Sequence, residues 1–235
     1  MSQGSNSSGG GSSGRTVATS AITQSGVIAD LTGSPLVYSQ MNYKKMGLNE
    51  ASVKQLEKFW KDHKIRKSEY GMSVDKDGNV VRMEHGKKGT VDPRSPQDTY
   101  LMSHNHPRGS EYEAGDLGGT FSTGDTNWFT KEGKGKHVQV MTAETYEGRY
   151  IIAKGKNFDN DGFRQWSQQI HSEAERKYKN QSSNLRAKAN AGEMSYTEWR
   201  DASKKAFNAY LVGLHNEILA NQKKYGYTYG LEERK

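Results

Sequence analysis

Two stripes of apolar residues at helical spacing occupy the last third of the chain. The first stripe recurs every three or four residues, the interval at which side chains share one face of an α-helix, and the second does so from Phe207 onward, about two helical turns after Trp199. Ser195-Tyr-Thr-Glu198 has the form of a capping box and predicts where the second helix begins. The stripes consist of Phe163, Trp166, Ile170, Ala174 and Tyr178, and of Trp199, Phe207, Leu211, Leu214 and Ile218. We therefore predict a helical hairpin over residues 158–235, with its turn at residues 190–192.

The first part of the chain lacks the apolar pattern of a folded domain. Residues 1–26 are rich in Gly and Ser, which predicts a flexible arm. Residues 27–47 carry scattered apolar side chains without a period, and we expect an extended segment there. The chain has no run of about 18 apolar residues, and its start lacks the basic and then apolar pattern of a secretory signal. We therefore expect neither a membrane segment nor a signal peptide.

Residues 48–157 alternate between helix and strand patterns. Asn49 can cap a helix over residues 50–64, whose apolar face includes Leu56 and Trp60. The turn at residues 75–78 joins two strands into a hairpin. Strand patterns cover residues 69–74, 79–83, 99–104, 138–141 and 149–153, and a short helix begins near Ser122. This order predicts an α+β domain with a mixed α/β/α arrangement, followed by the C-terminal helical hairpin.

The chemically most informative residues are His104-Asn105-His106-Pro107. On a strand, residues two apart face the same side, so His104 and His106 can present two imidazoles to one ion. Pro107 ends the strand directly after them. The chain contains no cysteine, so a metal here has to be held by imidazole and carboxylate groups.

Asp125 is the candidate for a third ligand. It follows Ser122 by three residues at the expected start of the short helix, where positions three apart share a face. A set of two histidines and one aspartate leaves the fourth tetrahedral position of zinc to water, as in catalytic zinc sites. Ser-x-x-Asp alone is a common helix start, and His-x-His alone is common without a metal. It is their combination that favours a zinc site.

The order of these motifs, a Glu after a helix, then His-x-His-Pro, then Ser-x-x-Asp, resembles the JAB/JAMM (MPN+) zinc metallopeptidases. The stretch His104-Asn-His106-Pro-Arg-Gly109 is similar to the RadC-like and phage-associated branch of that family. The resemblance implies a JAB/MPN-like domain with cytidine-deaminase-like layering over residues 48–157. It further implies Zn²⁺ bound by His104, His106 and Asp125. Because the signals for secretion and membrane insertion are missing, we expect a location in the cytoplasm of a bacterial cell or in a virion.

The resemblance also implies roles for two residues that do not bind the metal. Ser122 donates a hydrogen bond to the developing oxyanion. Glu69, directly after the first helix, corresponds to the glutamate that positions the attacking water, accepts its proton and returns it to the leaving amine. Glu84, at the far end of the predicted hairpin, competes for this role but is more simply a solvated turn residue. His137 is expected to be an ordinary packed or exposed histidine.

One departure from the family is the long connection before Ser122. Residues 107–121 are rich in Gly and acids, and they form either a flap that contacts substrate or a neutral surface insertion. Asp116 or Glu113 within this insertion is an alternative ligand in place of Asp125.

Three functions are compatible with these residues. The leading one is a zinc-dependent peptidase or isopeptidase that hydrolyses an amide bond in a protein substrate. The first alternative is a non-catalytic structural or interaction module, such as a phage virion component, that docks a protein partner through the hairpin. Retention of Glu69 and Ser122 favours the enzyme. The second alternative, a DNA-associated RadC-like protein, depends on the net charge of +7, although the basic residues are spread among acids.

Overall fold

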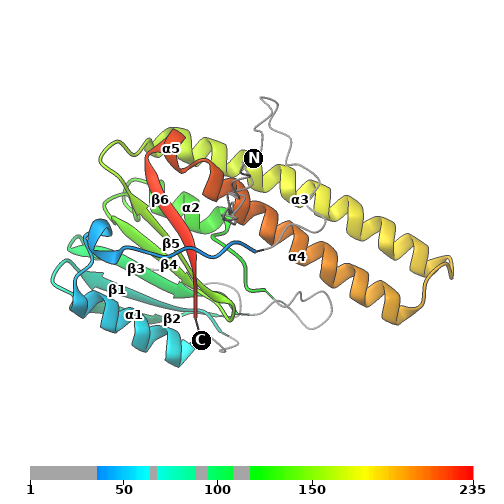
Figure 1. Cartoon of the computed structure of the whole chain (residues 1–235), viewed down its shortest axis with the longest axis horizontal. Coiled ribbons are helices and arrows are strands. Elements are labelled where there is room, and N and C mark those ends of the chain that lie inside the picture. The colour runs from blue at the N-terminus through cyan, green and yellow to red at the C-terminus, as the bar shows by residue number, and fades with distance from the viewer. Residues whose placement is uncertain (1–35, 64–67, 88–90, 92–94, 108–116, 235) are drawn as a thin grey trace, which may run out of the picture.

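The chain folds around one six-stranded sheet, seen in the computed structural model (Figure 1), which describes residues 36–63, 68–87, 91, 95–107 and 117–234. The strand order is β2-β1-β3-β4-β5-β6. Only β3 and β4 pair in parallel, and every other neighbouring pair is antiparallel. The strands are β1 (Tyr70–Asp75), β2 (Val80–His85), β3 (Thr99–Asn105), β4 (Val140–Glu144), β5 (Gly148–Lys154) and β6 (Tyr227–Glu233).

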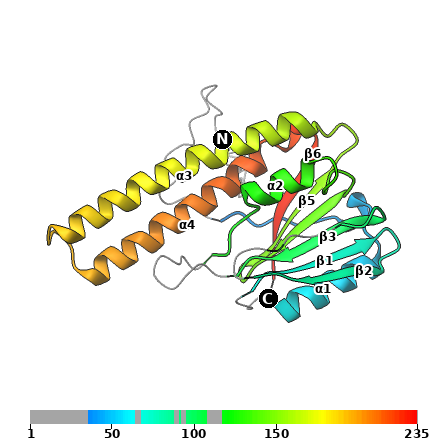
Figure 2. The ribbon, with the colours of Figure 1, turned by 180° about the vertical axis from the view of Figure 1, so that it is seen from behind.

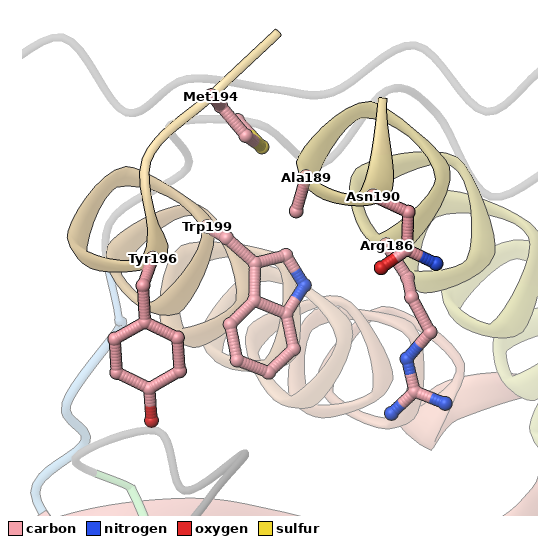
Figure 3. A pocket seen from close by; sticks show the side chains of 6 residues that line it. All are labelled: Arg186, Ala189, Asn190, Met194, Tyr196 and Trp199. Atoms are coloured by element: carbon pink, nitrogen blue, oxygen red, sulfur yellow. The ribbon is translucent and has the colours of Figure 1, made fainter. Parts of the chain in front are cut away.

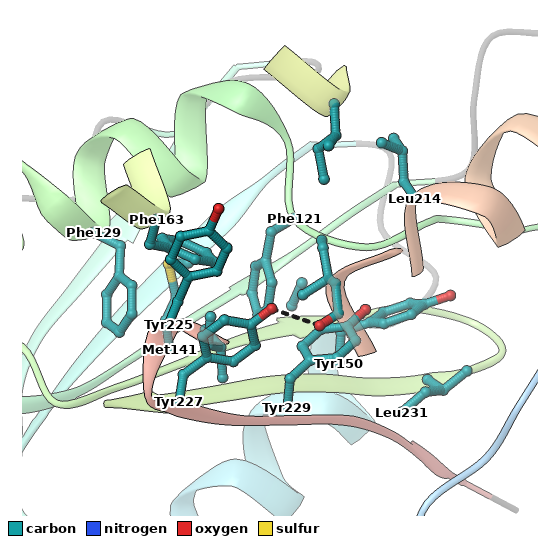
Figure 4. Close-up of a cluster of buried hydrophobic side chains, with 14 of the residues drawn as sticks. Phe121, Phe129, Met141, Tyr150, Phe163, Leu214, Tyr225, Tyr227, Tyr229 and Leu231 are labelled. Carbon is teal, nitrogen blue, oxygen red and sulfur yellow. Dashed lines mark hydrogen bonds between the residues drawn. The ribbon is translucent and has the colours of Figure 1, made fainter. Parts of the chain in front are cut away.

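Helices cover both faces of this sheet (Figures 1 and 2). Helix α1 (Glu50–His63) packs on one face, where Leu56 and Phe59 meet Leu101 and other strand residues in one core cluster. Three helices pack on the other face: α2 (Thr123–Thr130), α3 (Asn160–Asn190) and α4 (Tyr196–Ala220). Their apolar side chains form a second cluster with Met102 and the aromatic residues of β6 (Figure 4). Leu101 and Met102 enter opposite clusters because successive strand residues point to opposite faces.

The expected mixed α/β architecture with a C-terminal helical region is confirmed. The described helices and strands of residues 48–157 begin and end within about three residues of the predicted bounds, and the largest difference is the end of β4 (Val140–Glu144). The predicted C-terminal unit needs a correction, because residues 158–235 are not helical throughout. A short helix, α5 (Gln222–Tyr225), is capped at its C-terminus by Gly226. Strand β6 follows and pairs with β5. Tyr227, Tyr229 and Leu231 alternate inward, a period of two over only seven residues.

The segment before α1 lies along the sheet edge formed by β6. The backbone N–H of Ser39 donates to the carbonyl of Leu231 at 2.7 Å, and Leu36 packs against the larger core cluster. A short 3₁₀ helix, η1 (Tyr43–Met46), then leads towards α1. The rest of the expected extended segment, residues 27–35, and the expected arm, residues 1–26, lie outside the described residues.

Helices α3 and α4 extend beyond the sheet as a pair (Figure 2). The predicted stripes meet inside this pair, where the ring of Tyr178 lies 5.5 Å from Phe207 and 5.4 Å from Tyr210. At the far end, a cavity of about 320 Å³ is lined by Arg186, Ala189, Asn190, Met194, Tyr196 and Trp199 (Figure 3). Each helix in the described part of the chain is too short or too polar to cross a membrane.

A buried histidine joins α4 to the sheet and to the segment before α1. His215 Nε2 donates to the carbonyl of Val37 at 2.9 Å, so Nδ1 accepts a hydrogen bond from the Tyr229 hydroxyl at 2.8 Å. Tyr229 also contacts the Thr120 hydroxyl at 2.7 Å. Burial lowers the pKa of His215 to about 4, and the hydrogen bond to Val37 offsets only part of this shift.

We expect His215 to make the fold sensitive to acid. Between pH 6.5 and 4 the unfolded chain binds a proton at this residue that the folded chain excludes. The stability that neutral His215 contributes is therefore present above about pH 6.5 and is lost as the pH falls towards 4. From pH 7.5 to pH 4.5 the free energy of unfolding should fall in both proteins, and the fall in His215→Gln should be about 2–3 kcal/mol smaller than in wild type. Urea unfolding at both pH values measures this difference, and equal losses in the two proteins would contradict it.

Candidate metal centre

Strand β3 brings His104 and His106 to the same side of the sheet. Their Nε2 atoms lie 2.9 Å apart, and His104 is 2% exposed. Strand β3 lies between β1 and β4 in the interior of the sheet, and regular strand structure ends at Asn105, two residues before Pro107. The alternation expected of a strand therefore places both imidazoles on the same face as Met102, which is the face covered by α2, α3 and α4.

Asp125 reaches the two imidazoles from the start of α2. Its Oδ1 lies 3.2 Å from Nε2 of His104, and its Oδ2 lies 3.3 Å from Nε2 of His106. Ser122 is the N-cap residue of α2 and forms a capping box with Asp125. The Ser122 hydroxyl is exposed and donates to Asp125 Oδ2 at 2.8 Å, so it lies directly beside the carboxylate.

The three side chains fit a zinc ion by donor type and by spacing. One donor atom from each of His104, His106 and Asp125 can be chosen so that all lie within 4.8 Å of one another. In a tetrahedral site with bonds near 2.0–2.1 Å, neighbouring ligand atoms are about 3.3 Å apart. The two Nε2 atoms are 2.9 Å apart, and their distances to Asp125 are 3.2 Å to Oδ1 and 3.3 Å to Oδ2; all three are close to that value, although they involve both carboxylate oxygens. Such a ligand set leaves one tetrahedral position for water or substrate.

The charges of these groups depend on one another. Burial raises the pKa of Asp125, but the adjacent His104 and His106 outweigh it and hold the pKa well below its usual range. Burial lowers the pKa of His106, but the hydrogen bond and the charge of Asp125 outweigh burial and raise it above its usual value. Asp125 is therefore an ionised carboxylate, which is the form that binds a metal.

The end of the insertion orients His106. The Nδ1 atom of His106 lies 3.1 Å from the carbonyl of Gly119. A carbonyl can only accept a hydrogen bond, so Nδ1 carries the proton and Nε2 keeps its lone pair for a metal. The Glu147 carboxylate in turn accepts hydrogen bonds from the backbone N–H groups of Gly118 and Gly119 at 2.9–3.1 Å, and from the hydroxyl of Tyr150 at 3.1 Å.

We expect Glu147→Ala to weaken zinc binding without removing a ligand. Loss of the carboxylate frees the N–H groups of residues 118 and 119, and the carbonyl that orients His106 loses its anchor. Changes in such outer partners cost about 10–100-fold in metal affinity, and we expect about tenfold here. Competition with a chromophoric chelator measures the affinity. Glu132→Ala, which removes an exposed acid, is the control, and an unchanged affinity in Glu147→Ala would contradict this role.

Glu69 lies directly before β1 and close to this group. Burial raises its pKa above the usual value, while the nearby His106 and His104 lower it and Asp125 raises it. Glu69 is therefore near enough to interact electrostatically with all three candidate ligands. Glu84, the competing candidate, lies within β2 and pairs with Arg82 at 2.5 Å, so the expectation of a solvated turn residue is wrong.

Other sequence candidates are placed elsewhere. His137 Nε2 bonds to the carbonyl of Pro96 at 3.0 Å, away from the three ligand candidates, as expected for an ordinary packed histidine. Asp116 and Glu113, the alternative ligands, lie outside the described residues, as does most of the insertion. Sequence reasoning missed Gly119 and Glu147, because a backbone carbonyl and an acid on a distant turn carry no motif.

Comparisons with protein-family models, with curated proteins and with solved structures give no match to this chain.

Proposed function

We propose that this protein is a zinc-dependent peptidase or isopeptidase of the JAB/JAMM type, which hydrolyses an amide bond in a protein substrate. The observation that carries the proposal is the convergence of His104, His106 and Asp125 from β3 and α2, with Glu69 close by. The proposal includes the finer fold, a JAB-like domain over residues 48–157. The layers on both sides of the sheet and the order of the motifs support it.

Each residue has a separate part in the proposed reaction. His104, His106 and Asp125 would hold Zn²⁺, which supplies Lewis acidity and makes water more acidic. The Glu69 carboxylate accepts a proton from the attacking water and returns it to the nitrogen of the leaving amine. Burial raises the pKa of Glu69, which is the direction that makes a carboxylate a stronger proton acceptor. The exposed Ser122 hydroxyl donates to Asp125 in this structure, and in the reaction it would turn its single hydrogen to the oxygen that gains negative charge.

The test compares zinc-loaded wild type with Glu69→Gln on two substrates: a mixed peptide library and a set of lysine-branched isopeptides. New termini are identified by mass spectrometry. We expect cleavage by wild type that a chelator stops, and a loss of at least about 100-fold in Glu69→Gln, the low end of general-base effects. Glu69→Gln should keep its zinc, because Glu69 is not a ligand in this proposal.

Glu84→Gln is the matched control, because it removes an acid from the neighbouring strand β2. It should cleave like wild type. If Glu69→Gln stays fully active while Glu84→Gln is inactive, the base has been assigned to the wrong residue. If zinc-loaded wild type cleaves neither substrate, the peptidase proposal loses its support.

A second candidate, a non-catalytic interaction module, has one observation in its favour. The α3/α4 pair extends beyond the sheet, and its tip carries Tyr196, which is 63% exposed, beside Trp199 at a ring distance of 5.5 Å. An exposed tyrosine beside a partly buried tryptophan is typical of residues that anchor a protein partner. A non-catalytic interaction module would cleave neither substrate, so the cleavage assay of wild type and Glu69→Gln also distinguishes the two candidate functions.

A further inference from the structure

The proposed reaction requires Glu69 to keep its place beside the two imidazoles, although Glu69 lies just outside a strand. Strand β1 begins at Tyr70, and its pairing with β3 runs only as far as Gly71 opposite His104. On the other side, the Glu69 N–H donates to the carbonyl of Lys87 at 3.3 Å, and its carbonyl accepts from the N–H of Gly86 at 2.8 Å. Regular pairing with β3 therefore stops two residues short of Glu69.

The side chain of Asn105 hydrogen-bonds to the backbone where this pairing stops. Its Oδ1 accepts a hydrogen bond from the Tyr70 N–H at 2.6 Å, and its Nδ2 donates to the carbonyl of Ser68 at 3.2 Å. These two backbone groups lie on either side of Glu69 in the sequence. Asn105 is 0% exposed, so water does not compete for either bond. The amide thus bonds to the chain around Glu69 as the N–H and C=O of a strand partner would.

Asn105 also stands between the two histidines in the sequence. Successive strand residues point to opposite sides, so His104 and His106 turn towards Asp125 while the amide of Asn105 turns towards residues 68–70. We propose that Asn105 is a positioning residue that fixes the backbone of Glu69 relative to the two metal ligands. This inference rests on the proposed role of Glu69 as the base.

The chemistry of the amide explains why asparagine suits this position. The Asn side chain offers one acceptor and two donors, which match one N–H and one carbonyl. In Asn105→Asp the acceptor for the Tyr70 N–H remains, but a carboxylate oxygen then faces the Ser68 carbonyl and no donor is left. In Asn105→Ala both bonds are lost. Both variants therefore weaken the hold on residues 68–70: Asn105→Ala loses both bonds, and Asn105→Asp places a buried carboxylate without a cation against a carbonyl oxygen.

The test uses Co²⁺ as the metal probe at fixed pH, because its visible absorption bands report on the coordination of the ion and on the groups next to it. In Asn105→Ala we expect the Co²⁺ Kd to change by less than about tenfold, since no ligand is removed. We expect its spectrum to shift in the direction seen in Glu69→Gln, and we expect a shift in the same direction in Asn105→Asp. The spectrum of the double variant Asn105→Ala/Glu69→Gln should be the same as that of Glu69→Gln alone, because both substitutions act on the interaction between Glu69 and the metal site.

Hydrogen exchange measures the hydrogen bond from the Tyr70 N–H to Asn105 independently of the metal. The Tyr70 amide should lose at least about tenfold protection in Asn105→Ala. Ser103→Ala is the matched control: Ser103 is also a buried polar residue of β3, but its hydroxyl contacts Thr142 and Glu144. This control should alter stability and leave both the Co²⁺ spectrum and the Tyr70 amide unchanged.

The outcomes separate this inference from the proposed function. A wild-type spectrum in both Asn105 variants, together with a shifted spectrum in Glu69→Gln, would overturn the positioning role alone. A fall in Co²⁺ affinity as large as in His106→Ala would also overturn it, because Asn105 would then act through the ligands. If Glu69→Gln itself leaves the Co²⁺ spectrum unchanged, the proposed role of Glu69 fails first.

Discussion

Asp125→Ala is expected to reduce bound zinc from about one ion per chain to almost none. The substitution removes one of three ligands. Two neutral imidazoles remain, without the negative charge that the carboxylate would bring to the ion. We expect the affinity for zinc to fall by more than about 100-fold, which exceeds the usual effect of substituting a residue that only hydrogen-bonds to a ligand. Metal analysis of dialysed protein and competition with a chelator measure the two quantities.

The chain offers a matched control for this substitution. Ser195 and Glu198 form a capping box at the start of α4 that has the same hydrogen bonds as Ser122 and Asp125. Glu198→Ala should therefore cost a similar amount of helix stability, about 0.5–2 kcal/mol, without any loss of zinc. Equal zinc content in Asp125→Ala and wild type would show that Asp125 only caps α2.

Arg149→Met is expected to lower the free energy of unfolding by about 3–5 kcal/mol. Arg149 is 0% exposed, and its Nε atom donates to the equally buried Glu144 at 2.6 Å. Its Nη1 atom donates to the Tyr43 hydroxyl at 2.8 Å and to Glu57 at 3.3 Å. Burial raises the pKa of Glu144 although Arg149 lowers it, so removal of the guanidinium leaves a carboxylate in the core without its cation. Urea unfolding at pH 7.5 measures the loss.

Two further variants show whether the unpaired carboxylate causes the loss. Arg149→Met combined with Glu144→Gln should recover part of it, because the uncompensated charge is gone. Arg164→Met breaks the exposed pair of Arg164 and Asp161 and should change stability by no more than about 0.5 kcal/mol. A loss in Arg149→Met as small as in Arg164→Met would mean that the buried network is not stabilising.

Local sequence patterns were sufficient to predict the parts of this fold that depend on near neighbours. The His-x-His spacing predicts two imidazoles side by side, and they are adjacent in the structure, although β3 ends at Asn105 and His106 follows it. Ser122-x-x-Asp125 predicts a helix start, and α2 begins there. Strand β6 was missed because three alternating residues directly after a long helical stripe are too few to reveal a period of two. Its place at the sheet edge follows from pairing with β5, some 75 residues earlier in the chain.

The support around the candidate ligands could not be predicted for a related reason. Gly119 orients His106 through a backbone carbonyl, which any residue possesses, and Glu147 acts from the turn between β4 and β5. Asn105 stands inside the motif, yet its partners are backbone groups of residues 68 and 70, more than thirty positions away. Such contacts exist only after the strands have paired.

X-ray absorption at the zinc edge of purified protein shows whether His104, His106 and Asp125 hold the ion. We expect about one zinc per chain, with four nitrogen or oxygen neighbours near 2.0–2.1 Å and the outer scattering of two imidazoles. Protein that takes up no zinc, or that binds zinc with fewer than two imidazoles, would contradict this assignment.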